Sequence, residues 1–434
     1  MTGRSHAIKR IMARRVWDSR GQPTVEAEVV LHDDTAGRAI APAGASTGSG
    51  EAVDLRDGGT AFGGFDVTAA VDNVNTVISP ALRGYNVTDQ TALDQRLVDL
   101  DGTANKSRLG GNALIAVSMA ALHAAAGAAR LPLWRYLLGN ATALVPLPEI
   151  QIFGGGAHAG RRVDIQDFMV VAVGASTFSQ ALDWTADVYR AAGARMADAG
   201  KLQGVADEGG FWPVFDSNEE ALDCLVRAID DSGHAVGDEI AISLDVAASE
   251  FFRNGRYHLA LDAHDLDSDA LINLLITWID RYPIVSVEDP LAESDTTGMQ
   301  RFTAATGDRI QVIGDDYLVT NTARVERAAK ERACNTLLVK PNQAGTITET
   351  RAALNAAQRA GFGTIVSTRS GETEDVTIAH LAVGWRAGQL KVGSFSRSER
   401  MAKWNEILRI EESLGDTAVF AGSRALRCRN TPKN

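Results

Sequence analysis

Short apolar runs, each followed by a charged side chain, recur along the second half of the chain. The runs are three to five residues long, which is typical of buried parallel strands, and helix-like segments separate most of them. The residues that close the runs are Asp245, Glu288, Asp315, Lys340, Arg369 and Lys391. They are 43, 27, 25, 29 and 22 positions apart, which is about the length that a strand and its following helix need. The pattern predicts an α/β fold with a (β/α)8 barrel.

Such a barrel would bring the charged side chains together. Because its strands all end on one face, the closing residues converge on a common mouth. Three carboxylates, two lysines and an arginine would then share one cavity. This combination indicates a metal site with a base beside it.

The first 140 residues have a different pattern and predict a smaller α+β domain. Apolar and acidic residues alternate over 24–31, which favours a half-buried strand. Residues 112–129 are rich in alanine and predict a close-packing helix. The loop over residues 43–48 is rich in glycine and hydroxyl groups, as expected of a mobile lid, although a polar turn would have the same composition.

The two prolines within residues 141–148 predict a linker between this domain and the barrel. We therefore expect a capping domain over 1–140, a catalytic barrel over 141–415 and a polar C-terminal tail over 416–434. A chain of 434 residues has room for a barrel of about 250 residues and a second domain.

Charge and cysteine content narrow the function. The net charge of −12 argues against a nucleic-acid partner, because no basic excess is present to neutralise phosphates. Cys224, Cys334 and Cys428 form neither a CxxC pair nor an even disulfide framework. No signal peptide is apparent, and no apolar run approaches the roughly 20 residues that cross a bilayer. These features predict a cytoplasmic protein without a membrane partner.

An acidic pair, Asp207 and Glu208, precedes two glycines. At a strand end such a pair can place a carboxylate in the barrel mouth, and a simple turn would have the same composition. The glycines at 154–156 lack the GxGxxG spacing and the following helix of a dinucleotide site.

Many short motifs resemble those of the enolase family, from near residue 8 to about residue 413. They are DSRGQPTVE (18–26), GASTGS (44–49), DLDGTANKS (99–107), DIQDFM (164–169), DEGG (207–210), LDVAASEFF (244–252), SVEDP (286–290), GDD (314–316), VKPNQAGT (339–346), RSGETED (369–375) and SRSERMAKWN (396–405). The resemblance implies a capping α+β domain and an αβ-barrel that uses Mg²⁺ to interconvert 2-phosphoglycerate and phosphoenolpyruvate. It also implies a homo-oligomer, a dimer or larger.

The resemblance further implies a role for each candidate residue. Asp245, Glu288 and Asp315 would hold one Mg²⁺, and the loop carrying Ser46 would bring in a second together with the substrate phosphate. Lys340 would be the base at C2, with a pKa that nearby cations and low polarity can lower. Lys391 would bind the substrate carboxylate, and Arg369 and Ser370 would bind the phosphate. Glu208 would be the acid that protonates the departing hydroxide. The leaving hydroxyl would be surrounded by His158, Asp167 and Thr368.

The departures from the family cluster in the leaving-group pocket. Enolases have Glu where this chain has Asp167, His where it has Thr368, and Asn-Gly-Gly-Glu-His where it has residues 154–158. Where enolases have Asn-Asn or a similar pair, this chain has Arg161 and Arg162. Where enolases have Phe after the base lysine, this chain has Pro341. Losing an imidazole removes a proton carrier that titrates near pH 7.

These changes imply an enolase scaffold adapted to a bulkier or more anionic reactant. A relative with such a role is the carboxyphosphonoenolpyruvate synthase of phosphinothricin-type antibiotic biosynthesis, which makes a phosphonate-bearing enolpyruvate. An ordinary enolase and a catalytically silent enolase-like binding protein are the alternatives. The retained lysines and carboxylates argue against the silent protein, because a non-enzyme has no chemical need of them.

Overall fold

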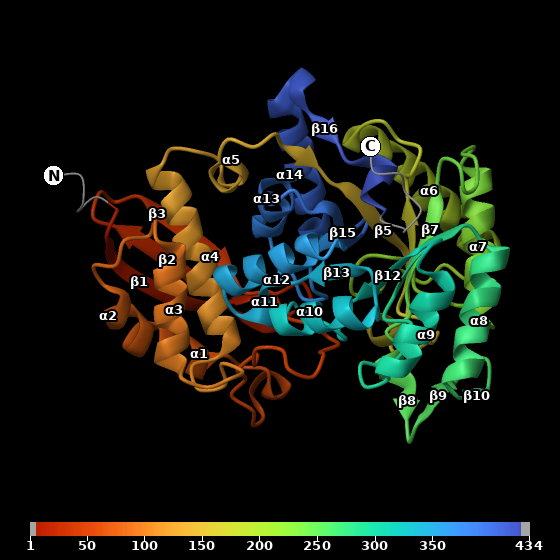
Figure 1. The fold of residues 1–434 in the computed structure, drawn as a ribbon, viewed down its shortest axis with the longest axis horizontal. Coiled ribbons are helices and arrows are strands. Elements are labelled where there is room, and N and C mark those ends of the chain that lie inside the picture. Colours follow the sequence, from red (N-terminus) through yellow and green to blue (C-terminus); the bar gives the residue numbers. More distant parts are fainter. Residues whose placement is uncertain (1–5, 427–434) are drawn as a thin grey trace.

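The computed structural model describes residues 6–426. Cys428 and residues 427–434 of the predicted tail lie outside this range. Within it, the chain forms a small antiparallel sheet with covering helices, followed by a closed eight-stranded barrel (Figure 1).

The N-terminal sheet consists of β1 (Ile8–Trp17), β2 (Pro23–Leu31) and β3 (Ala36–Ile40). The predicted strand at 24–31 is confirmed as β2, but it is buried along almost its whole length rather than on one face. One reason is that Arg14 and Arg38 cover the carboxylate of Glu26 and form ion pairs with it. Burial of an acidic residue is tolerated where such partners neutralise it.

Helix α4 (Gly111–Ala128) is the helix predicted at 112–129 and packs against β2 and β3. A Cβ atom at Gly37 of β3 would lie 2.2 Å from the backbone nitrogen of Ala124, so only glycine allows this close approach. The helix is long and apolar enough to cross a bilayer by length and composition, but 83% of it is buried inside the protein. It is the central helix of the capping core.

Shorter helices complete this part of the chain. They are α1 (Thr68–Asn73), α2 (Ser79–Leu82), α3 (Gln90–Asp101) and α5 (Leu133–Leu138).

The barrel closes in the order β11-β12-β13-β14-β15-β5-β6-β7. Its strands are β5 (Leu147–Gly154), β6 (Asp167–Val171), β7 (Ala241–Asp245), β11 (Ile284–Glu288), β12 (Gln311–Gly314), β13 (Thr336–Val339), β14 (Gly363–Ser367) and β15 (Gly388–Ser394). The six strands predicted from the apolar runs are all parallel to their neighbours among them.

Strand β6 departs from the expected all-parallel arrangement, because it runs antiparallel to both β5 and β7. Residues 155–166 connect β5 to β6, and the only helix in this connection is the short turn Gly156–Ala159. A parallel crossover usually contains a full helix, and this connection lacks one, so the chain returns alongside β5 in the opposite direction. The first residue of β6, rather than its last, therefore lies at the mouth.

Helices surround the barrel, and Figure 1 shows α10, α11 and α12 in front of its strands, towards the capping helices. The helices are α6 (Phe178–Asp198), α7 (Asn218–Asp231), α8 (Ser268–Arg281), α9 (Thr296–Thr306), α10 (Thr322–Glu331), α11 (Pro341–Ala344), α12 (Ile347–Arg359), α13 (Thr377–Gly384) and α14 (Ser398–Leu414). Contacts of α11 and α12 with α4, and of α12 with α3, join the two parts of the molecule.

Two small sheets complete the fold. Strands β8 (Phe252–Arg253), β9 (Arg256–Leu259) and β10 (His264–Leu266) form a surface sheet. Strand β16 (Val419–Phe420) pairs in parallel with β4 (Leu144–Val145), so residues 419–420 of the predicted tail belong to a two-stranded sheet.

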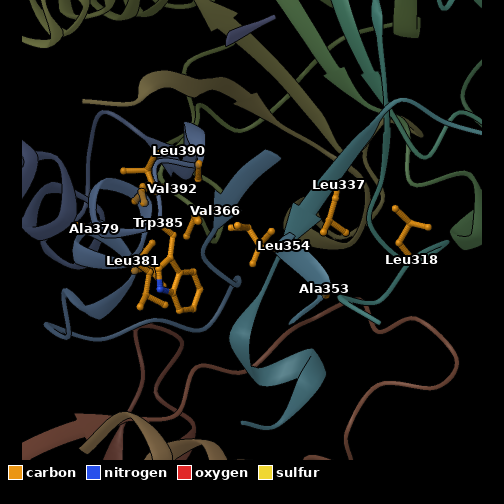
Figure 2. Packing of buried hydrophobic residues seen from close by; sticks show 14 of the residues in the cluster. Leu318, Leu337, Ala353, Leu354, Val366, Ala379, Leu381, Trp385, Leu390 and Val392 are labelled. Atoms are coloured by element: carbon orange, nitrogen blue, oxygen red, sulfur yellow. The ribbon is translucent and has the colours of Figure 1, made fainter. Parts of the chain in front are cut away.

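Side chains of the barrel strands alternate between two environments. Outward-facing residues pack under the helices, and Figure 2 shows Leu354 of α12 between Leu337 of β13 and Val366 of β14. Ile313, Leu338 and Ile365 form a separate buried cluster. Because every second residue points to the same side of a strand, the residue two positions after each of these continues the interior row towards the mouth.

Candidate active site

Lys391 lies among three buried carboxylates at the barrel mouth. Its Nζ atom is 3.0 Å from Asp245 Oδ2, 2.9 Å from Glu288 Oε2 and 3.3 Å from Asp167 Oδ2. Burial opposes its charge, but Asp245, Glu288 and Asp167 raise the pKa of Lys391 well above its ordinary value. The predicted strand end at Lys391 is wrong, because β15 continues to Ser394. Asp167 reaches this cluster because antiparallel β6 pairs it directly with Asp245.

Lys340, the predicted base, follows the last residue of β13 and hydrogen-bonds Asp315 Oδ2. The other oxygen of Asp315 accepts a hydrogen bond from Gln343 at 2.9 Å. Burial lowers the pKa of Lys340, but the charges of Asp315 and Glu288 together outweigh burial, so its pKa is raised in this structure. The nearest partner of the ammonium is the Asp315 carboxylate, whereas the lowering expected from the sequence depends on nearby cations.

Of the three predicted metal ligands, Asp245 lines the cavity at the mouth, whereas Glu288 and Asp315 bind the two lysines, Lys391 and Lys340. Burial and the nearby charge of Asp245 raise the pKa of Glu288 well above its ordinary value. Its Oε1 atom is buried and has no hydrogen-bond partner among the described residues. Carboxylate oxygens are the ligands that Mg²⁺ prefers, so Asp245, Glu288 and Asp315 fit this ion.

Asp315 also belongs to a second acidic group that the sequence reasoning did not single out. Oxygen atoms of Asp289, Asp315 and Asp316 lie within 4.8 Å of one another. The Asp289 carboxylate accepts the backbone N–H groups of Asp315 at 3.0 Å and Asp316 at 2.7 Å. Asp289 therefore fixes the turn that aims Asp315 at the mouth. Both additional residues lie within quoted motifs, Asp316 in GDD and Asp289 in SVEDP, but neither was assigned a role.

His158, Asp167 and Glu208 come together on one side of the mouth, as the resemblance predicts. His158 Nε2 is 3.9 Å from Asp167 Oδ1 and 3.8 Å from Glu208 Oε1. Burial raises the pKa of Glu208. The nearby positive charges, with His158 and Arg400 the largest, together lower it by more, so the pKa lies below its ordinary value. Glu208 lies in a loop and not at a strand end. The loop is held to the barrel by a hydrogen bond from Ser394 N to Glu208 O at 2.9 Å.

Thr368 takes part in a network around Arg400 of α14, which the sequence reasoning missed. Arg400 is fully buried, and its Nη1 atom donates to Thr368 Oγ1 at 3.1 Å and to Arg369 O at 2.7 Å. Its Nη2 atom donates to Ser370 O at 2.5 Å. Arg400 thereby shapes the turn that carries three predicted substrate-binding residues. It lies within the motif at 396–405, which was the only signal for it.

The predicted phosphate side is closed by the loop at 43–48. Arg369 Nη2 donates to Ser46 O at 2.8 Å, and Arg369 Nη1 pairs with Glu51 at 2.9 Å. Ser370 Oγ accepts the N–H of Ala45 at 2.6 Å. The cavity beneath this loop has a volume of only about 20 Å³. The loop therefore covers the mouth in this structure.

Glu149 is a further buried acid that the sequence reasoning missed. It lies on β5, paired in register with Lys391, and accepts hydrogen bonds from the hydroxyls of Ser243 and, at 3.3 Å, Ser286. Each serine comes two residues before a predicted metal ligand on its own strand. Burial raises the pKa of Glu149, and its Oε2 atom has no hydrogen-bond partner among the described residues. This group lies one interior position back along the strands from Asp245 and Glu288, the predicted metal ligands.

The two arginines expected near the mouth, Arg161 and Arg162, do not line its cavity. Arg161 is exposed and pairs with Glu250 at 2.6 Å. Arg162 is partly buried, and neither lines the central cavity.

Comparisons with known proteins agree with this geometry. Residues 8–137 match the family model described as the enolase N-terminal domain, and residues 142–429 match that of the enolase C-terminal TIM barrel domain. The chain is 49% identical over 416 residues to Enolase 1 of Desulfitobacterium hafniense (strain Y51), with 95% of each chain covered. With both halves of the chain matched and the lysines and carboxylates gathered at one mouth, this protein belongs to the enolase family.

Proposed function

We propose that this protein is a Mg²⁺-dependent enolase-type lyase with an altered leaving-group pocket. It would form an enolpyruvate from a small phosphorylated acid by removing the proton alpha to the carboxylate. The observation that carries the proposal is the meeting of Lys340 and Lys391 with Asp245, Glu288 and Asp315 at one buried mouth. The proposal also includes a cytoplasmic location and assembly as a homo-oligomer. It divides the chain into a capping domain over 1–140, a barrel over 141–415 and a tail over 416–434.

The reaction needs stabilisation of a carbanion next to a carboxylate. This carbanion and the carboxylate together carry two negative charges, which Mg²⁺ held by the three carboxylates of the protein would neutralise. The proposal includes two Mg²⁺ ions, a number taken from the family resemblance. Lys340 would take the C2 proton, and Lys391 would face the substrate carboxylate. Arg369 and Ser370, now engaged by the 43–48 loop, would turn to the phosphate, for which a guanidinium offers a forked set of donors.

The leaving-group side favours a specialised reaction as the first candidate. Asp167 hydrogen-bonds Gln151 and lies 3.3 Å from Lys391, and Thr368 is bound to Arg400. Neither arrangement offers the imidazole and the longer carboxylate that enolases have there. This supports a carboxyphosphonoenolpyruvate synthase-like role in phosphonate antibiotic biosynthesis over ordinary dehydration of 2-phosphoglycerate.

Parallel assays of two substrates test the proposal. One substrate is 2-phosphoglycerate, and the other is the glycerate analogue in which a carboxyphosphonate group replaces the phosphate. We expect Mg²⁺-dependent formation of the enolpyruvate from the analogue and weak or absent turnover of 2-phosphoglycerate. Efficient turnover of 2-phosphoglycerate alone would identify an ordinary enolase. No turnover of either substrate and no exchange at C2 would indicate a silent binding protein.

A further inference from the structure

A second cavity lies at the end of the barrel opposite the mouth. It has a volume of about 650 Å³, and its lining includes Gly363 and Gly388, the first residues of β14 and β15. These parallel strands lead away from the cavity towards Thr368 and Lys391 at the mouth. The two cavities are therefore separated by the length of the barrel.

The lining of this cavity is cationic in an otherwise acidic protein. Arg351 of α12, Arg386 and Arg424 contribute to its wall, and no Asp or Glu is among the described residues that line it. The net charge of the whole chain is −12, so three arginines without a carboxylate are a local reversal of charge. Apolar side chains complete the wall, namely Leu137, Leu144, Phe362, Trp385 and Val419.

Arg351 is the best-placed cation. Its guanidinium carbon lies 5.4 Å from the ring centroid of Trp385, which is shown in Figure 2 beside Leu381 of α13. Its Nη1 atom is buried and has no hydrogen-bond partner among the described residues. Burial lowers the pKa of Arg351, and no carboxylate among residues 6–426 acts against this effect. A buried donor of a charged group without a partner is costly, and an anion would relieve that cost.

The other two arginines leave their charge available at the same wall. Arg386 and Arg424 are exposed to solvent. Among the described residues, Arg424 donates to a backbone carbonyl, that of Phe420, at 3.2 Å. Three guanidiniums with forked donors suit an oxyanion with several acceptor oxygens and more than one negative charge.

We propose that this cavity is a binding site for a small organic phosphate monoester, separate from the active site. The phosphate would bind to Arg351 with Arg386 and Arg424, and the organic part would lie against Trp385 and Phe362. The volume is within the range of small-molecule sites, about 300–1,000 Å³, and is much larger than inorganic phosphate needs. The apolar wall accounts for the organic part, which inorganic phosphate lacks.

Calorimetric titration of the full-length protein with phenyl phosphate tests the proposal. Four single variants are compared with the wild type: Arg351→Met, Arg351→Lys, Arg369→Met and Arg253→Met. Met replaces the aliphatic part of the Arg side chain and removes the charged guanidinium. Arg253, exposed at the end of β8, is the matched surface control. Arg369→Met removes the predicted phosphate contact in the mouth, so it separates binding there from binding in the second cavity.

We expect phenyl phosphate to bind the wild type and Arg369→Met, and to bind Arg351→Met at least tenfold more weakly. Arg351→Lys should recover part of the affinity, and Arg253→Met should bind as the wild type does. Circular dichroism of Arg351→Met should match the wild type. Absence of binding, or binding lost in Arg369→Met and unchanged in Arg351→Met, would overturn the site. Equal affinity for inorganic phosphate would overturn the organic part of the assignment.

Discussion

The hydroxyl oxygen of Thr368 lies 3.1 Å from Nη1 of Arg400, a guanidinium that is fully buried. The hydroxyl in turn donates to Val392 O at 3.0 Å. The position at which enolases have an imidazole is thus occupied by a group that does not titrate near neutral pH. In the proposed function, proton handling in the leaving-group pocket would fall to His158, Asp167 and Glu208, which lie together there.

Restoring the two missing proton-handling groups should raise dehydration of 2-phosphoglycerate. We expect Asp167→Glu combined with Thr368→His to increase the rate at least about tenfold, because general acid–base groups typically contribute 10²- to 10⁴-fold. The pair is tested together with each single change, since neighbouring groups in one pocket are rarely additive. A double variant no faster than the wild type would mean that the pocket does not limit the reaction.

Removing Arg400 should loosen the turn that carries Arg369 and Ser370. Arg400→Met loses donors to Thr368 Oγ1, Arg369 O and Ser370 O, and we expect a loss of about 3 kcal/mol in unfolding free energy. Denaturant unfolding measures the loss, and a raised KM for the phosphorylated substrate should accompany it. Arg409→Met, an exposed site on the same helix, is the control. Equal stability of the two variants would refute this structural role.

The metal assignment predicts a selective loss of Mg²⁺ affinity. Asp245→Asn and Glu288→Gln each remove a charged ligand, so calorimetry should show Mg²⁺ binding weakened at least tenfold and activity abolished, with the fold kept. Asp238→Asn and Glu331→Gln make the same chemical changes at exposed positions and should bind Mg²⁺ as the wild type does. Unchanged affinity in both site variants would place the metal elsewhere.

Asp94 predicts a pH dependence of stability. Its buried carboxylate accepts hydrogen bonds from Ser118 at 2.6 Å and from the backbone N–H of Thr348 at 2.8 Å, which joins α3 to α4 and α12. Burial raises the pKa of Asp94 to about 6. The folded protein therefore binds this proton more tightly than the unfolded chain, and the stability that the proton confers is lost as the pH rises from about 4 through about 6.

The expected loss is about 3 kcal/mol, and Asp94→Asn should remove it because the amide does not titrate. Denaturant unfolding between about pH 4 and about pH 7 compares the wild type, Asp94→Asn and the exposed control Asp238→Asn. The control should keep the slope of the wild type. The same slope in Asp94→Asn would show that another group is responsible.

The barrel strands could be predicted because apolar runs of strand length are a local signal. Asp245 and Glu288 end β7 and β11 as the runs indicated, and Lys340 directly follows β13. Strand direction is not a local signal, so the reversal of β6 could be recognised only from its pairing with β5 and β7. The same holds for the extension of β15 beyond Lys391.

The residues that were missed are buried charges whose partners are distant in sequence. Glu149 meets Ser243 and Ser286, which are 94 and 137 positions away. Arg400 meets Thr368 and the neighbouring carbonyls from a helix about one barrel unit further along the chain. A lone Glu in an apolar run or an Arg in a polar helix has no spacing pattern, so only the folded chain shows what it binds.

Exchange of the C2 proton of 2-phosphoglycerate with solvent deuterium tests the central claim most directly, because it reports proton abstraction without requiring the leaving group to depart. We predict that the wild type catalyses Mg²⁺-dependent exchange faster than it catalyses dehydration, and that Lys340→Ala catalyses no exchange. Lys330→Ala, which changes an exposed lysine on α10, is the control and should behave as the wild type does. Exchange by Lys340→Ala at the wild-type rate would contradict the assignment of the base. Dehydration by the wild type at an ordinary turnover of about 10–100 per second would contradict the altered leaving-group pocket.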